Sequence, residues 1–274
     1  MALTVWPRGP AWVTGARPRL LAAAALWLVL VGVHAAEAQS PGDRPNQVAV
    51  EYGYTYFDTI FDPWHLASLE YTRSTLAGPV IGRANYARRF DASGLQLEVD
   101  AYPTLHRGWY AYLNAGYGLA GSFPDWRAGG EVFASLPAAW EASAGFRHLQ
   151  FGEGYTMWTG SVGKYHGNSW FSVRPFLLRD QGDLSWTILF AARRYFTDAQ
   201  HYLGVLAAYG STPGDVLTEL ELERQNDLKV EATGKHPLGA GLRWQWRASI
   251  EREELNGDQV RHRVGVTLRF ERVF

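Results

Sequence analysis

The sequence predicts an all-β protein whose antiparallel strands, about fourteen in number, close into a transmembrane barrel of the outer-membrane type after an N-terminal signal peptide. Three observations lead to this prediction. Apolar and polar residues alternate along successive segments, aromatic residues recur near the segment ends, and a charged and then apolar stretch precedes them. The segments are about 9 to 13 residues long, which is the length that a tilted strand needs to cross a bilayer.

The N-terminus has the layout of a secretory signal peptide. Arg17 and Arg19 precede an apolar run that ends at Val33, and the small residues "AEA" follow at Ala36–Ala38. This run is shorter than the roughly 20 apolar residues of a membrane-spanning helix. The expected segments are a signal peptide (1–38), a short polar periplasmic leader (39–46) and the barrel (47–274).

Composition and charge do not indicate a nucleic-acid partner or a disulfide-linked protein. Loss of residues 1–38, which hold three arginines and one glutamate, changes the formal charge from −1 to −3. So small a charge, without a basic cluster, does not indicate a nucleic-acid partner. The chain has no cysteine, which fits an exported protein that does without disulfides.

Period-two alternation begins directly after the leader and continues to the end of the chain. The clearest alternating segments are 48–56, 95–102, 140–147, 184–190, 228–233, 242–251 and 263–270. Turn sequences such as "DASG", "FGEG", "HGNS" and "LNGD" separate the segments. Counting between turns gives about fourteen strands, or twelve if two marginal segments are loops. Either even number places both ends of the chain on the same side of the membrane.

A soluble β-sandwich would show the same alternation, because it also has one apolar and one polar face. Long strands, the signal peptide and aromatic residues at the level of the two membrane interfaces favour the barrel. The aromatic residues expected in these interface girdles are Tyr52, Tyr71, Trp109, Trp126, Trp158, Trp170, Tyr195 and Tyr202.

The last segment, "RVGVTLRF", resembles the C-terminal signal that the barrel-assembly machinery reads in outer-membrane proteins. Val264, Val266, Leu268 and Phe270 share the apolar face of this strand. The residues expected to carry the signal are Gly265, Leu268, Phe270 and the terminal Phe274.

Longer stretches, among them "IEREELNGDQVRHRVGVTLRF", "HYLGVLAAYGSTPGD" and "NSWFSVRPFLLRD", resemble the YaiO-like outer-membrane β-barrel family. The resemblance covers roughly residues 47–274. It implies an outer-membrane barrel without established catalytic residues, in a family often associated with glycan-polymer synthesis. Some relatives carry a periplasmic helical-repeat domain. The leader is too short for one, so a periplasmic partner is expected to be a separate protein.

Strand parity predicts which charged residues face the lumen. The set expected inside is Glu51, Glu70, Arg83, Arg89, Glu98, Asp100, Glu131, Glu141, Arg147, Arg174, Lys229, Glu231, Arg243, Arg247, Glu251, Arg261, Arg263 and Arg269. The candidate binding residues among them are Glu51, Glu98, Asp100, Arg243, Arg247, Glu251, Arg263 and Arg269. Arg243, Arg247 and Arg263 are expected to form a cationic patch for anions or sugar hydroxyls. Opposing acids such as Glu51 are expected within reach of this patch, because closure pairs the last strand with the first. The alternative for each residue is a paired charge that only keeps the interior polar.

The sequence gives little support to an enzyme. His65 and Ser68 are three residues apart, so in a strand they face opposite sides and cannot form a dyad by themselves. His148 has the parity of the apolar face. His106, His166 and His236 fall in or near turns without partners at metal-ligand spacing, and neither a cofactor nor a metal is expected.

The expected function is that of a channel or accessory element in envelope or exopolysaccharide glycan export. Two alternatives stay open: a lipid- or glycan-modifying enzyme of the outer membrane, and a structural or receptor barrel with a plugged lumen. The expected partners are outer-membrane lipids, the barrel-assembly machinery, and a glycan or the proteins that synthesise it.

Overall fold

Residues 46–58, 62–89, 92–119, 121–180, 183–211, 226–255 and 259–274 are described by the computed structural model. The predicted signal peptide lies outside these residues, as does the predicted leader apart from Asn46. No helix in the described part of the chain is long and apolar enough to cross a membrane.

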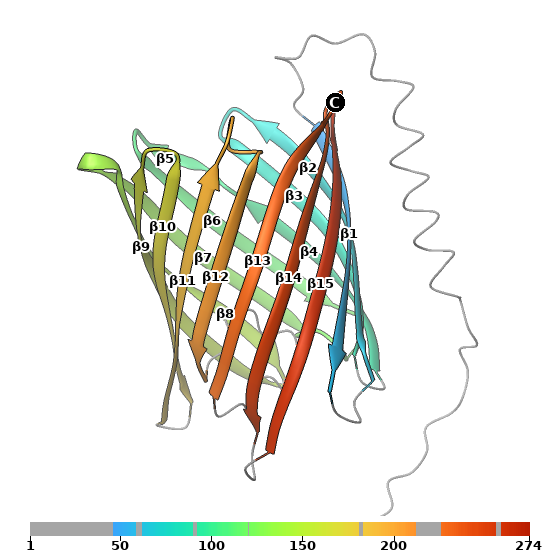
Figure 1. Cartoon of the computed structure of the whole chain (residues 1–274). Coiled ribbons are helices and arrows are strands. Elements are labelled where there is room, and N and C mark those ends of the chain that lie inside the picture. The colour runs from blue at the N-terminus through green and yellow to red at the C-terminus, as the bar shows by residue number, and fades with distance from the viewer. Residues whose placement is uncertain are drawn as a thin grey trace, which may run out of the picture.

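Antiparallel strands make up nearly all of the described chain (Figure 1). They are β1 (Asn46–Phe57), β2 (Trp64–Thr75), β3 (Gly78–Arg89), β4 (Ala92–Ala101), β5 (Thr104–His106), β6 (Trp109–Gly118), β7 (Trp126–Leu136), β8 (Trp140–Phe151), β9 (Glu153–His166), β10 (Ser169–Asp180), β11 (Asp183–Tyr195), β12 (Tyr202–Gly210), β13 (Asn226–Gly239), β14 (Leu242–Leu255) and β15 (Gln259–Val273). A 3-10 turn, Pro137–Ala139, joins β7 to β8.

The sheet closes on itself. Strands that follow one another in the chain pair with each other, apart from β4 and β5, and β1 pairs with β15, placing Val50 opposite Phe270. The short β5 follows β4 after a two-residue break and pairs with the same strand, β6, so β4 and β5 together make one wall position. The described strands thus form a fourteen-stranded barrel, which confirms the predicted fold and strand count.

The two faces of every strand differ as the alternation predicted. On β1, Tyr52, Tyr54 and Tyr56 are exposed on the outside, whereas Ala49 and Phe57 are buried on the inside. On β15, the apolar set Val264, Val266 and Leu268 is exposed, and the intervening residues face the lumen. An apolar band on the outside of a closed barrel is the surface that a lipid bilayer requires.

The two ends of the barrel can be told apart. β1 begins and β15 ends at the same end, where the backbones of Asn46 and Phe274 hydrogen-bond to each other. In outer-membrane barrels this end lies in the periplasm. The ends of β1 and β12, where β2 and β13 next begin, lie at the opposite, external end.

Five of the predicted girdle aromatics lie on the lipid face, and three do not. Tyr52, Tyr71, Trp109, Trp126 and Trp158 are exposed on the outside. Trp170, Tyr195 and Tyr202 have the inward parity of their strands, so their assignment to the girdle was wrong. Arg193, which also faces inward, contacts both Trp170 and Tyr202, and this contact holds the rings inside the lumen.

Candidate functional site: a charge-paired lumen

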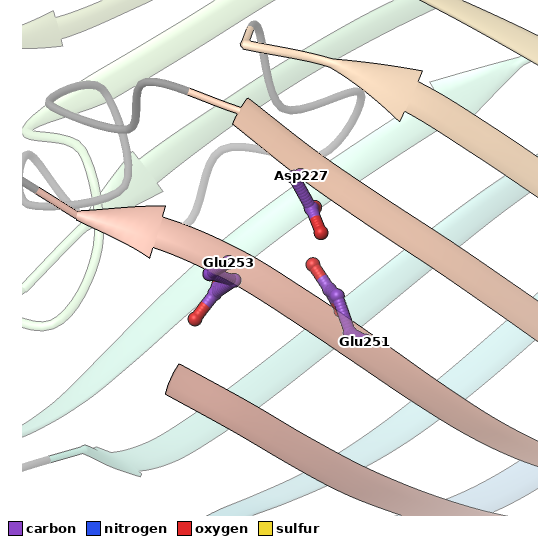
Figure 2. Close-up of side chains that lie close together, drawn as sticks. All are labelled: Asp227, Glu251 and Glu253. Atoms are coloured by element: carbon purple, nitrogen blue, oxygen red, sulfur yellow. The ribbon is translucent and has the colours of Figure 1, made fainter. Parts of the chain in front are cut away.

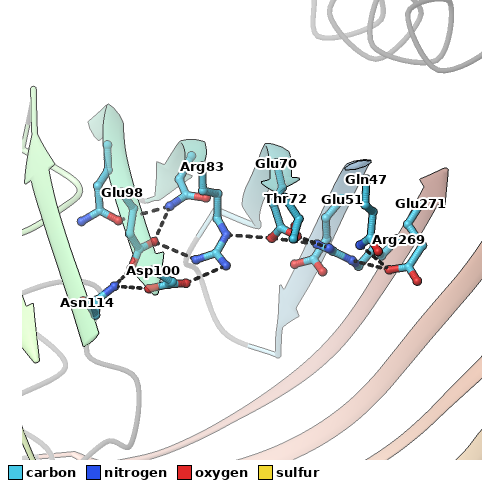
Figure 3. Close-up of polar contacts among 12 residues, drawn as sticks. Gln47, Glu51, Glu70, Thr72, Arg83, Glu98, Asp100, Asn114, Arg269 and Glu271 are labelled. Atoms are coloured by element: carbon cyan, nitrogen blue, oxygen red, sulfur yellow. Dashed lines mark hydrogen bonds and ion pairs between the residues drawn. The ribbon is translucent and has the colours of Figure 1, made fainter. Parts of the chain in front are cut away.

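A row of alternating charges crosses the inner wall from β2 to β4. Glu70, Arg83 and Glu98 lie directly opposite one another in neighbouring strands. The Arg83 guanidinium donates from Nε to Glu70 (3.1 Å) and from Nη1 to Glu98 (3.0 Å). Its Nη2 donates to Asp100 (3.1 Å), as Figure 3 shows. One cation therefore serves three carboxylates, each of which is almost fully buried.

The row continues across the closure of the barrel. Arg269 of β15 donates to Glu70 on β2, across β1, and also lies 3.5 Å from Glu271. Glu271 is 2 % exposed and is the acceptor for two further cations. The Lys235 ammonium lies 2.7 Å away and the Arg243 guanidinium 3.4 Å away. Charge pairing thus ties β13, β14, β15 and β2 together.

In the other direction the row passes through β6. The Asn114 amide donates to Glu98 (2.7 Å) and to Asp100 (2.6 Å), and the Tyr112 hydroxyl donates to Asp100 (3.2 Å). Arg127 of β7 donates to the Asn114 carbonyl oxygen (3.1 Å). Buried polar groups that are all hydrogen-bonded in this way stabilise one arrangement of the wall.

A second acid on β7 extends the network to β10. Glu131, which is 2 % exposed, accepts from Ser143 (2.6 Å), Arg147 (2.8 Å) and Arg174 (2.7 Å). The Arg147 guanidinium lies 4.7 Å from the ring centre of Tyr112, which connects this group to the first row. We call the connected set the ion-pair belt. Its charged members are Lys235, Arg243, Glu271, Arg269, Glu70, Arg83, Glu98, Asp100, Arg127, Arg147, Glu131 and Arg174.

The belt residues on β2, β3, β4, β7, β13 and β15 surround a polar cavity of about 690 Å³ inside the barrel. Five carboxylates and five cationic side chains line it, so their formal charges cancel. The acids are Glu51, Glu70, Glu98, Asp100 and Glu271, and the cations are Arg83, Arg127, Lys235, Arg247 and Arg269. Four aromatic residues, Tyr86, Tyr102, Tyr112 and Phe123, also line this cavity.

The structure places all eight candidate binding residues on the lumen side, as parity predicted, but it does not bring them all together. Glu51, Glu98, Asp100, Arg247 and Arg269 line the cavity. Arg243 reaches it only through Glu271. Glu251 and Arg263 pair with each other and lie toward the external end of β14 and β15.

The expected cationic patch is not present. Arg247 pairs with Glu51 at 2.8 Å and Arg263 pairs with Glu251, so the predicted members are neutralised one by one. They also lie at different heights in the wall, because Arg263 is level with Glu251, four residues along β14 from Arg247. Sequence parity gave the correct face, whereas the neighbour of each charge depends on the register between strands.

Toward the external end, three acids lie close together on β13 and β14 (Figure 2). Oxygen atoms of Asp227, Glu251 and Glu253 are within 4.8 Å of one another. Arg261 donates to Glu253 (2.6 Å) and Arg263 donates to Glu251 (2.6 Å). Two guanidinium groups therefore already occupy the space beside the carboxylates, and the group is an ion-pair cluster.

The histidines support the parity argument against a dyad. The His65 ring lies outside the barrel, with Nδ1 2.7 Å from the Tyr52 hydroxyl, whereas Ser68 lines the internal cavity. His148 also lies outside, where its ring stacks on Trp126 at 4.6 Å. Neither histidine reaches the lumen in which Ser68 lies.

Several belt residues were missed by the sequence analysis, namely Lys235, Glu271, Arg127, Asn114 and Tyr112. Parity carried the signal for each of them. Glu271 has the parity of Arg269 on β15, and Arg127 has the parity of Glu131 on β7. Counting in steps of two along each strand from the predicted residue would have found the missed one.

Gly265, Leu268 and Phe270 of the predicted assembly signal lie in the last strand, next to the closure, and Phe274 follows that strand directly. Leu268 and Phe270 face the lipid, opposite Trp246 and Trp244 of β14. Gly265 faces the lumen, where a Cβ would lie 2.7 Å from the Ser249 hydroxyl. These positions are compatible with a recognition signal, whose function stays a prediction.

Comparison with known proteins agrees with this architecture. The family described as "YaiO membrane beta barrel domain" matches residues 45–215. No curated protein matches the sequence. Among solved structures, a "Bacterial polysaccharide outer membrane secretin" is similar with a TM-score of 0.56 and 8 % identity, over 84 % of this chain and 99 % of that one.

Two further structures are similar in the same range. The Pseudomonas putida toluene transporter TodX has a TM-score of 0.54 at 8 % identity, over 86 % of this chain and 90 % of that one. The Acinetobacter baumannii outer membrane protein Omp33 has a TM-score of 0.51 at 13 % identity, over 83 % and 98 %. At such identities the likeness concerns the fold.

Proposed function

The chain belongs to the YaiO membrane β-barrel family of the bacterial outer membrane, and on this premise we propose that it is a channel through which an uncharged, polyhydroxylated glycan crosses that membrane. The observation that carries the proposal is the balanced set of five carboxylates and five cations around the polar cavity.

The chemistry of this lining suits sugar hydroxyl groups better than ions. A hydroxyl group both donates and accepts hydrogen bonds, so it can bind a carboxylate and a guanidinium that lie side by side. A free anion or cation meets equal numbers of like and opposite charges at the same wall. Weak ion selectivity and many hydrogen-bonding positions are therefore expected together.

The bacterial polysaccharide outer membrane secretin has a similar fold, which supports this proposal. The outer-membrane lipids would contact the apolar outer band. The proteins that make the glycan would contact the periplasmic end, where β1 begins and β15 ends. The barrel-assembly machinery would contact the last strand.

The proposal is tested by single-channel recording of the purified protein in planar bilayers. The expected result is an open channel with a reversal potential near zero in a salt gradient and a current that an uncharged oligosaccharide reduces reversibly. Strong anion or cation selectivity without any effect of the sugar would overturn the glycan assignment. Absence of conductance would overturn the channel and favour a structural or receptor barrel.

A further inference from the structure

Aromatic side chains gather on the inner wall at the periplasmic end, on β6, β7 and β9 to β12. Trp170 lies directly between Tyr165 of β9 and Arg193 of β11 in the strand register. Tyr195 lies opposite Tyr202. We call six of these residues the aromatic arc: Tyr110, Phe133, Tyr165, Trp170, Tyr195 and Tyr202.

The arc lies inside the lumen at one end of it. Trp170 has the parity of Arg174 and Phe133 has that of Glu131, and both of these charged residues belong to the ion-pair belt. Tyr165 is the penultimate residue of β9, and Tyr202 is the first of β12. Because these positions adjoin the periplasmic turns, a molecule entering from the periplasm meets the arc first.

The rings lie in three pairs along the wall. Tyr110 and Phe133 stack with centroids 4.6 Å apart, Tyr165 and Trp170 are 6.4 Å apart, and Tyr195 and Tyr202 are 5.9 Å apart. Arg193 joins two of these pairs, with its guanidinium carbon 5.3 Å from the Trp170 centroid and 4.9 Å from that of Tyr202.

The arc combines supporting and accessible rings. Tyr202 is 6 % exposed and packs within the wall, whereas Tyr165 is 44 % exposed to the lumen. Trp170 lies against the bare backbone of Gly163, where a Cβ would be only 3.0 Å from the indole Nε1. The absence of a side chain at this position lets the indole lie against the strand.

An accessible aromatic surface in a polar lumen needs a physical reason. These rings face away from the bilayer, so they cannot serve as the lipid girdle. A pyranose ring carries C–H groups on its faces and hydroxyl groups at its edge. Aromatic faces carry partial negative charge and bury apolar area well, so they accept the C–H face. Charged residues lie beside the rings, Arg193 against Trp170 and Glu141 opposite Gly163, where they can bind the hydroxyl edge.

From this arrangement we infer that the aromatic arc is a stacking site for the pyranose rings of a glycan at the periplasmic entrance of the lumen. The inference rests on the proposed function, because it identifies where the same glycan first contacts the barrel. The belt begins where the arc ends, since Lys235 lies opposite Tyr202. A chain held by stacking at the arc would then meet the hydrogen-bonding wall of the cavity.

Binding is measured by calorimetry and tryptophan fluorescence on the whole purified protein in detergent, with the uncharged hexamers maltohexaose and cellohexaose as probes. Polyethylene glycol of similar length, which lacks ring faces, is the chemical control. Tyr165→Ala and Trp170→Ala are each expected to weaken hexamer binding by about tenfold, which corresponds to the roughly 1.4 kcal/mol of one aromatic contact. Tyr165→Phe keeps the ring and is expected to bind like the wild type.

Two further variants separate stacking from loss of structure. Gly163→Ala keeps every ring but displaces the Trp170 indole, so it is expected to weaken binding. Trp158→Ala removes a lipid-facing tryptophan from the same strand as Tyr165, so its binding is expected to be unchanged. Heat-modifiable migration in gels verifies that each variant is folded.

The result that overturns the inference is hexamer binding that is absent from the wild type, or that falls equally in Trp158→Ala. In that case a conducting, sugar-sensitive channel would still support the proposed function. Binding that depends on Tyr165 and Trp170 in a barrel that does not conduct would support the stacking site and overturn the channel. The two proposals can therefore fail separately.

Discussion

Arg269 donates two hydrogen bonds to Glu70 although β1 lies between their strands. The contact therefore spans the closure of the barrel, which is otherwise formed by the backbone ladder of β1 with β15. Glu70 is 5 % exposed, and Arg83 is its other cationic partner.

Replacing Arg269 is expected to destabilise the barrel. Arg269→Ala leaves two buried carboxylates, Glu70 and Glu271, with one cation fewer, and the free energy of unfolding should fall by about 2 kcal/mol. Urea unfolding in lipid vesicles, followed by tryptophan fluorescence, measures the change. Arg252→Ala is the matched control because its pair with Glu254 is solvent-exposed, and it should cost less than about 1 kcal/mol. Equal losses in both variants would contradict the structural importance of the closure contact.

Removing one cavity cation should change ion selectivity. Arg247→Ala leaves five carboxylates facing four cations, so the reversal potential in a salt gradient should shift toward cation preference. The shift should shrink as salt rises, because Arg247 is 39 % exposed and its charge is screened. Lys164→Ala, which removes a cation from the outer face, should leave the reversal potential unchanged. A wild-type value for Arg247→Ala would place the conduction path away from this cavity.

Gly145 should not tolerate a methyl group. A Cβ there would lie 2.3 Å from the Gly130 carbonyl oxygen and 2.6 Å from the Glu131 Cβ. Gly145→Ala would push Glu131 away from its arginines and lower the free energy of unfolding by about 2 kcal/mol. A Cβ at Gly82 meets nothing within 4 Å, so Gly82→Ala should change stability by less than about 0.5 kcal/mol. If Gly145→Ala leaves the free energy of unfolding unchanged, β7 and β8 can move apart without loss of stability.

At the external end, Asp58, the residue after β1, contacts His262 of β15. The backbone N–H of His262 donates to its carboxylate (2.9 Å), the His262 ring lies 2.7 Å from its other oxygen, and these contacts lower the pKa of Asp58. Because the folded pKa is lowered, the stabilisation is present above the unfolded pKa and is lost as pH falls through the folded one. The difference in unfolding midpoint between wild type and Asp58→Asn should therefore close in acid. A difference that does not vary with pH would exclude this linkage.

The C-terminal signal predicts a defect in assembly. Changing Phe270 and Phe274 together to Ser should lower the amount of protease-resistant, heat-modifiable barrel in outer-membrane fractions. Phe196→Ser, which removes an exposed aromatic at the same end outside the last strand, should assemble normally. If the double variant assembles at the wild-type level, the resemblance to the assembly signal is incidental.

The fold followed from the sequence because period-two alternation fixes which side of a strand each residue faces. All of the charged residues assigned to the lumen by parity face it, including Glu131 and Arg174, whose strands are three apart. Parity does not give the register between strands, and this is why the partner of Arg263 could not be foreseen. The misplaced Trp170 has a different cause. An aromatic residue near a strand end fits a lipid girdle and a lumen mouth equally well, and only its parity with Arg174 separates them.

The pairing of opposite charges around the polar cavity determines the range over which its wall acts. The five carboxylates and five cations there cancel beyond a distance comparable to their separation, so the cavity lining has little long-range field. A small ion that travels along the axis is then neither attracted nor repelled, while a hydroxyl group that touches the wall meets strong donors and acceptors at once. Such a wall sorts molecules by contact, and the residence time of a solute would depend on how many of its groups reach the surface together.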